Sequence, residues 1–544
     1  MRLANAAILT AFLALWLTAL HAHETAADEQ TRQLGNVHFE TSCKPEAQPE
    51  FDRGVAALHS FYFGEAKRSF SASLQADPRC AISYWGLAMT GLGNMLVSPP
   101  TPKALADSQA LLKKGFDLGA GSQRERDYMS ALQTLFTDAD TRDHRFRSLA
   151  YEEAMEALYK HYPQDQEAAL FYALALNVTA LPNDKTYANQ LKAADILDKV
   201  SVLQPDHPGV LHYLIHSLDY PPLAIRALPA AQRYAQVAPA APHAQHMPSH
   251  TYSMLGEWEG SIQSNKVALD LATDAATKQL ITQAVLDLYI AHCTDFMIYA
   301  HLQMTQDGRA KRIVDEALDY QRAHEVTKVP ISAQTGFAAI SARYVLERKA
   351  WADADNLRVL QKDVAYAEAI IRFTRSLGAS HTGQLDKARA EIAELEALRE
   401  AAIASKESYW EGQIAVLRLA ASAWLAQAQG QPNDALRLMR EAANLEDTSE
   451  KHVAMENRLY PMRELLADLL LENAQPQAAM IEYEASLLAA PNRFNAFYGA
   501  ARAAELAGDR DKSRAYFEKL LVLSKDSDTE RPEIATAKLF LAVR

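Results

Sequence analysis

Apolar residues recur at intervals of three and four along most of this chain, and glycine and proline interrupt the pattern at regular points. A period of about 3.6 residues is typical of amphipathic helices that bury one face. Strict apolar–polar alternation, which predicts strands, is almost absent. The pattern therefore predicts an all-α fold of helices joined by short turns.

One spacing returns several times: a small residue, a bulky apolar residue four positions on, another small residue, and then a proline. Copies span Ala66–Pro78, Ala193–Pro205, Ala230–Pro242 and Ala479–Pro491. Small residues let two helices approach, the bulky residue fills the gap between them, and proline ends the second helix. Gly54 stands twelve residues before Ala66, on the helix expected to pack against it.

This spacing resembles the second half of a tetratricopeptide repeat, a helix–turn–helix unit of about 34 residues. About eight copies, some degenerate, cover most of residues 50–521. The resemblance implies a right-handed superhelical solenoid with a concave groove. The order of motifs at residues 80–89, 243–252, 446–452 and 491–509 is also similar to that of a group of secreted bacterial tetratricopeptide-repeat proteins of largely unassigned function.

We divide the chain by composition and repeat pattern. The ranges are a signal peptide (1–22), an N-terminal extension (23–47), N-terminal repeats (48–98), inserted helices that fit the repeat poorly (99–147), central repeats (148–346) and C-terminal repeats (347–544). The signal peptide is predicted from one early Arg, an apolar run of roughly fifteen residues, and small residues at the cleavage positions Ala22 or Ala27. We therefore expect a periplasmic or secreted protein with no membrane span after cleavage.

Charge and cysteine content narrow the picture further. The formal net charge is -13 and the sequence pI is about 5.7, which argues against nucleic acid as a partner. Of the three cysteines, Cys43 and Cys80 are a candidate disulfide in an oxidising compartment. Two buried, unpaired thiols are the alternative. No nucleophile elbow, phosphate loop, dinucleotide motif or zinc-protease motif is present, so enzymatic activity stays open and no catalytic residue is assigned.

Histidines are concentrated in one part of the chain. Of 17 in all, five fall between positions 212 and 250, including the pairs His212/His216 and His246/His250. Residues four apart lie on the same face of a helix, so each pair can hold one metal ion. Imidazole-rich ligation without thiolate suits Zn, Cu, Ni or Fe and does not choose between them.

The resemblance adds a location, because the first helix of each tetratricopeptide repeat faces the groove. We count repeat positions from Pro205 and Pro242 for two of these helices and from Ala310 for the third. In this register, three consecutive first helices direct His and Asp side chains to the groove. The predicted ligands or ligand-orienting groups of one transition-metal site are His212, His216, Asp219, His243, His246, His250, His292 and Asp295. Tyr299 is a candidate proton-transfer group, and Lys451 and His452 are candidates to close the far end of the groove.

Two functions follow. In the first, an extracytoplasmic repeat scaffold carries a His-rich metal site for metal handling or metal-assisted chemistry. In the second, the scaffold is free of metal and its groove binds a protein or peptide partner, with the histidines forming a polar wall.

Overall fold

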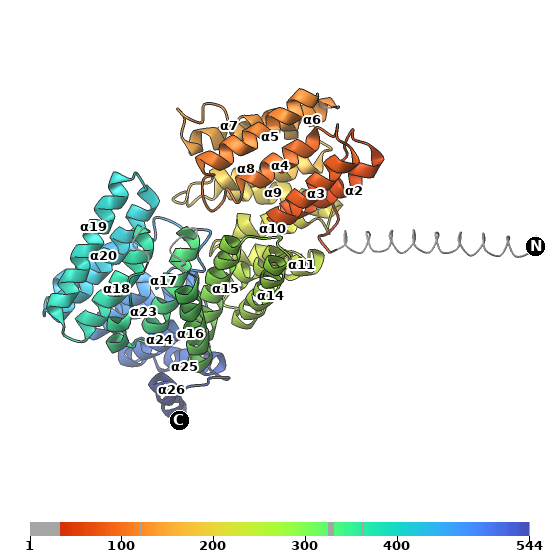
Figure 1. Ribbon diagram of the computed structural model, residues 1–544. Helices are drawn as coiled ribbons and strands as arrows, with labels where there is room; N and C mark the ends of the chain where they lie inside the picture. The colour runs from red at the N-terminus through yellow and green to blue at the C-terminus, as the bar shows by residue number, and fades with distance from the viewer. Residues whose placement is uncertain (1–32, 120, 325–330, 361–363, 543–544) are drawn as a thin grey trace, which may run out of the picture. The chain divides into compact units, whose positions relative to one another are not determined.

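The computed structural model describes residues 33–119, 121–324, 331–360 and 364–542, and these form helices and turns with no strand (Figure 1). The signal peptide and part of the N-terminal extension lie outside the described residues. Within the described residues, no helix combines the length and the apolarity needed to cross a bilayer. The prediction of an all-α fold is confirmed.

The chain divides into two compact units, which are described separately. Unit 1 comprises residues up to 179 together with 193–214 and 232–245, and unit 2 comprises 180–192, 215–231 and 246–544. The helices wholly in unit 1 are α2 (Gln48–His59), α3 (Phe63–Ala76), α4 (Ile82–Leu92), α5 (Pro102–Leu118), α6 (Gln123–Gln133), α7 (His144–His161) and α8 (Gln166–Thr179), after a short 3₁₀ turn, η1 (Pro45–Ala47).

Four helices contribute residues to both units: α9 (Ala188–Leu203), α10 (Pro208–Leu218), α11 (Ala224–Val237) and α12 (Pro242–His246). The helices of unit 2 are α13 (Pro248–Leu255), α14 (Trp258–Thr277), α15 (Gln283–Gln303), α16 (Asp307–Ala323), α17 (Ile331–Leu346), α18 (Ala365–His381), α19 (Leu385–Ala404), α20 (Ser408–Ala428), α21 (Pro432–Glu446), α22 (Met462–Glu472), α23 (Pro476–Ala489), α24 (Phe494–Ala507), α25 (Arg510–Leu523) and α26 (Pro532–Ala542), with a 3₁₀ helix, η3 (Trp351–Asn356), before α18.

Helices pack in the order of the sequence, each against the next and often against the next but one. The sets α2/α3/α4 in unit 1 and α18/α19/α20 in unit 2 show this arrangement. Such local packing is the organisation of helix–turn–helix repeat arrays, in which each unit buries its apolar face on its neighbours. It confirms the predicted solenoid class.

The bulky residue of the repeat pattern packs against a glycine of a neighbouring helix. In unit 1 a Cβ placed on Gly54 of α2 would lie 2.7 Å from the Phe70 ring, and one on Gly86 of α4 would lie 2.6 Å from the same ring. In unit 2 a Cβ on Gly499 would come within 2.1 Å of Tyr483. Glycine is required at these positions because the backbone itself forms the slot for the ring.

The structure also joins Cys43 and Cys80 in a disulfide bond, 37 residues apart in the sequence. The bond ties the segment before η1 to the turn that precedes α4. Cys293 is a buried free thiol.

Candidate metal centre

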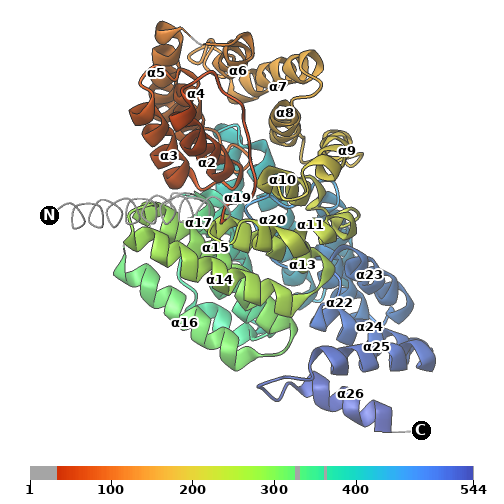
Figure 2. The same ribbon diagram turned by 90° about the vertical axis from the view of Figure 1, so that its right-hand side faces the viewer.

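Unit 2 brings three of the predicted histidines together. His246 ends α12, His250 lies in the first turn of α13, and His292 lies in the middle of α15. Helices α13, α14 and α15 pack against one another (Figure 2). One ligand atom from each ring lies within 4.8 Å of the others, and His246 and His250 are 1% and 2% exposed.

The i, i+4 pair does not sit on an unbroken helix. Met247 separates α12 from α13, although its own backbone is right-handed helical. Pro248 begins α13, where its missing N–H costs nothing because the first helical turn has no internal acceptor for it. The two rings nevertheless converge, with their Nε2 atoms 3.0 Å apart.

The hydrogen bonds on the other side of each ring determine where the protons lie. His250 Nδ1 is 2.9 Å from Asp219 Oδ2, and His246 Nδ1 is 2.7 Å from Asn265 Oδ1. Asn265 Nδ2 donates to Ser261 O at 2.8 Å, which fixes the amide with its oxygen toward His246. Both rings therefore carry their proton on Nδ1, and both Nε2 atoms present lone pairs.

Two lone pairs at 3.0 Å repel each other unless a cation lies between them. A proton is disfavoured, because burial lowers the pKa of His246 to about 4 and also lowers that of His250 well below its ordinary value. Burial, together with the neighbouring His246 and His250, lowers the pKa of His292 in the same direction. The cluster is therefore neutral at pH 7, and neutral imidazole is the form that binds metals.

The separations agree with metal ligation in part. Two nitrogens at tetrahedral positions about 2.0–2.1 Å from Zn²⁺ lie about 3.3–3.4 Å apart, close to the distance between the two Nε2 atoms. The ligand atoms of all three rings lie within 4.8 Å of one another, so the rings are close enough to hold one metal ion.

Asp219 acts through His250. Its Oδ2 accepts from His250 Nδ1 and also from Lys451 Nζ at 2.8 Å. A carboxylate behind a ligating imidazole fixes the ring and raises its basicity, as in many metal sites. Lys451 balances the charge of Asp219. Two predicted residues, Asp219 and Lys451, therefore lie behind the candidate ligand His250.

One aromatic ring packs against all three histidines. The Phe296 ring centroid lies 5.0–5.1 Å from those of His246, His250 and His292. Cys293 Sγ is 3.8 Å from His246 Nδ1, but burial raises the pKa of this thiol, so it is not a thiolate ligand. The cluster thus offers nitrogen donors rather than a thiolate.

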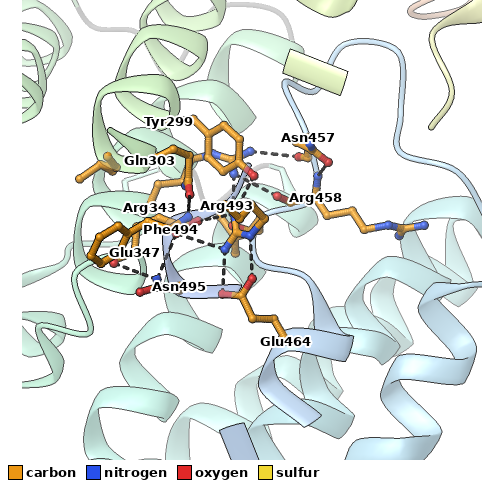
Figure 3. A network of polar contacts seen from close by, with 12 residues as sticks. Tyr299, Gln303, Arg343, Glu347, Asn457, Arg458, Glu464, Arg493, Phe494 and Asn495 are labelled. Carbon is orange, nitrogen blue, oxygen red and sulfur yellow. Dashed lines mark hydrogen bonds and ion pairs between the residues drawn. The ribbon is translucent and has the colours of Figure 1, made fainter. Parts of the chain in front are cut away.

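Two other predicted residues, Asp295 and Tyr299, contact buried arginines of unit 2 instead, and Figure 3 shows Tyr299 in this network. Asp295 accepts from Arg343 Nε at 2.8 Å, and Tyr299 Oη accepts from Arg493 Nη1 at 2.6 Å. Arg493 also bridges Glu347 and Glu464. These ion pairs occupy Asp295 and Tyr299 in structural contacts.

Two further predicted residues of unit 2, His452 and His216, make other contacts. His452 packs against the rings of Tyr409 and Trp410, and its Nδ1 accepts from the backbone N–H of Ala454 at 3.2 Å. The His216 ring centroid lies 6.3 Å from that of His250.

In unit 1 the structure brings His212 and His243 together. Their Nε2 atoms are 3.0 Å apart, and His212 Nδ1 donates to His59 O at 2.6 Å. A proton on His243 Nε2 donated to His212 Nε2 satisfies this pair without a metal. Phe61 packs against both rings.

A second cluster of unit 1 was missed by the histidine spacing. Glu167 bridges His59 Nε2 at 2.7 Å and His207 Nε2 at 3.0 Å, and all three side chains are buried. The backbone N–H of Gly209 donates to His207 Nδ1 at 3.1 Å, and Tyr213 Oη is 3.0 Å from His59 Nδ1. Both imidazoles therefore direct an N–H at the carboxylate. Burial raises the pKa of Glu167, but the two imidazoles outweigh it and hold the pKa far below its ordinary value.

Comparison with known proteins gives no family. No family model and no curated protein matches this chain. Solved structures similar to it include yeast Tom70 (12% identity, 92% of this chain and 89% of that one, TM-score 0.29) and the APC/C hetero-tetramer Cut9–Hcn1 (13%, 92% and 97%, 0.29). A third is Naa15/Naa10 bound to HypK (13%, 91% and 72%, 0.24). Scores this low support no conclusion about what this chain does.

Proposed function

We propose that this protein is a helical-repeat scaffold that binds one transition-metal ion in unit 2 through His246, His250 and His292. The observation that carries the proposal is the 3.0 Å distance between the Nε2 atoms of His246 and His250. An acceptor behind each ring holds its proton on Nδ1, so the two Nε2 lone pairs face each other. A buried polar arrangement of this kind is costly unless a cation fills it.

The ligand set suggests which chemistry the site supports. Three imidazoles leave a fourth position of a tetrahedral ion for water or another ligand, as in catalytic zinc sites. Zn, Cu, Ni and Fe all accept nitrogen ligands of this type. The helical-repeat scaffold around the site offers extended surfaces of the kind that bind protein partners.

We also propose that the protein works outside the cytoplasm. The Cys43–Cys80 bond supports this location, because structural disulfides form and persist in oxidising compartments. Secretion of the full chain with removal of residues 1–22, measured by mass spectrometry of the mature protein, tests it. A protein that stays in the cytoplasm with its thiols reduced contradicts it.

The test of the metal site is the elemental content of the purified protein and of apoprotein reloaded separately with Zn, Cu, Ni and Fe. We expect close to one ion per chain, lost in the triple variant His246→Ala/His250→Ala/His292→Ala. The variant His452→Ala is the matched control, since it removes a histidine of the same unit that lies against Tyr409 and Trp410.

Circular dichroism establishes that each variant is folded. A wild-type protein that holds none of the four metals and resists reloading contradicts the proposal. The alternative function is then a metal-free scaffold that binds a protein or peptide partner. Metal retained by the triple variant contradicts the ligand assignment.

A further inference from the structure

A cavity of about 320 Å³ lies in unit 2, within the usual size range of small-molecule sites. The segment 446–463, between the end of α21 and the start of α22, forms much of its wall, and α23 contributes Ser486 and Ala489. Pro221, Pro222 and Met254 supply apolar surface.

The carboxylates that line the cavity already have partners. Glu450 pairs with Lys185 and accepts from Tyr187 Oη, and Asp447 pairs with Arg463. Glu446 accepts from the backbone N–H of Met462. The acidic side of the lining therefore has little capacity left for a ligand that donates hydrogen bonds.

The polar atoms of the lining that lack a hydrogen-bond partner are mainly donors. Asn457 Nδ2 is buried without an acceptor, and so is the hydroxyl of Ser486. Arg458 Nη1 also makes no hydrogen bond, although Glu446 Oε1 lies 3.7 Å from it, and Nη2 of the same side chain donates to Ser449 O. Asn457 is 6% exposed, and its Oδ1 is already used by the backbone N–H of Arg458. Buried donors without acceptors are costly, so an acceptor group is expected at this place.

A buried arginine fixes the segment that carries these donors. Arg343 donates from Nη1 to Arg458 O and Leu459 O and from Nη2 to Asn457 O, at 3.0–3.2 Å. The Arg458 side chain points away from this network (Figure 3) and lines the cavity. The donors are thus held in place before any ligand arrives, which lowers the entropic cost of binding.

From this geometry we propose that the cavity is a binding site for a small organic acid, whose carboxylate accepts from Asn457 and Arg458 and whose apolar part contacts Pro221, Pro222 and Met254. Arginine with a second donor is a preferred partner of planar carboxylates. The four cationic side chains of the lining, Lys185, Lys451, Arg458 and Arg463, face three acidic ones, Glu446, Asp447 and Glu450, so a single negative charge is favoured over a dianion.

The proposal is independent of the metal site, although the two adjoin. Lys451 lines the cavity and also donates to Asp219, which holds His250. Binding is therefore measured first on chelator-treated protein, in which a carboxylate has no metal to ligate. If the protein binds no metal, the measurement of carboxylate binding is still valid.

The experiment uses the full-length mature protein and three probes: 3-methylbutanoate, its neutral amide, and inorganic phosphate. Saturation-transfer NMR and calorimetry are expected to detect the carboxylate at millimolar concentration, with at least tenfold weaker binding of the amide and of phosphate. Asn457→Asp keeps the shape of the side chain and its Oδ1 acceptor but removes the donor. We expect it to weaken 3-methylbutanoate binding at least tenfold.

Asn433→Asp, which makes the same charge change at an exposed position in the first turn of α21, is the matched control and should bind as the wild type does. Ser486→Ala is a milder second variant, for which we expect a twofold to fivefold loss. Equal binding of acid and amide, preference for phosphate, absence of binding to the wild type, or unchanged binding by Asn457→Asp overturns the proposal.

Discussion

Two buried histidine clusters in this protein have similar composition and opposite hydrogen-bond direction. In unit 1, His59 and His207 direct N–H groups at the Glu167 carboxylate, and every polar atom of that bridge has a partner of complementary sign. In unit 2, His246 and His250 direct lone pairs at each other because Asn265 and Asp219 hold their protons on the far side. The direction of the N–H bonds, rather than the number of histidines, separates this structural cluster from the proposed metal site.

The largest expected effect is the loss of metal affinity when His250, a proposed ligand in unit 2, is removed. Structural zinc sites contribute about 10–16 kcal/mol over their ligands, so loss of one ligand costs about 3–4 kcal/mol, or several hundredfold in affinity. His250→Ala should lower the affinity for the preferred metal by that factor. A competition titration with a chromogenic chelator measures the affinity. His59→Ala should leave the affinity unchanged, and a comparable loss there would erase the distinction between the clusters.

The second prediction breaks the cluster of unit 1. Glu167→Gln places an amide NH₂ against an imidazole N–H and removes the only negative charge of the bridge. We expect the free energy of unfolding to fall by about 3 kcal/mol, since breaking a buried charged network is costly. Urea denaturation followed by circular dichroism measures it. Metal content should be unaffected by this change.

The third prediction concerns pH. The pKa of His246 is lowered by burial from 6.5 to about 4. Between these values the unfolded chain binds a proton that the folded chain does not, so the stability of metal-free protein falls as the pH drops from about 6.5 toward 4. The loss is on the order of 3 kcal/mol for this one group.

Urea denaturation across this pH range should show a smaller decline in His246→Gln than in the wild type. An identical decline in the two proteins would mean that His246 is not buried as a neutral ring.

The fourth prediction concerns the carboxylate behind His250. Asp219→Asn keeps an oxygen toward the ring but loses the charge, and changes behind a metal ligand typically cost 10–100-fold in affinity. The same competition titration measures it. The control is Asp447→Asn, which removes a carboxylate of unit 2 that forms an ion pair with Arg463. Full affinity in Asp219→Asn would show that the carboxylate has no role in holding the ring.

The smallest expected effect on metal affinity concerns Asn265, the neutral hydrogen-bond acceptor behind His246. Asn265→Ala releases the Nδ1 proton of His246 and lets the ring adopt the other tautomer, so we expect about a tenfold loss of metal affinity. The NMR shifts of the His246 ring nitrogens report the tautomer directly. A ring that keeps its proton on Nδ1 in the variant would contradict the role of Asn265.

Much of the fold was predictable from local pattern. The positions of Gly54, Phe70 and the helix-ending prolines depend on neighbours in the sequence, and local packing preserves that information. The pair His246/His250 was predictable for the same reason. The acceptors Asn265 and Glu167 were not, because they lie on other helices and nothing in their local sequence marks them. His207 lay just outside the histidine-rich segment and was assigned no role.

The Phe70 ring, which fits against Gly54 on one helix and Gly86 on another, has a consequence for how such a chain can evolve. A methyl group at either glycine collides with the ring, so neither position can change first. A smaller residue at position 70 leaves a void, which is costly in its own right but tolerable, and then permits alanine at both glycines. Substitutions at the three positions should therefore appear together in related sequences, with the aromatic residue lost before either glycine.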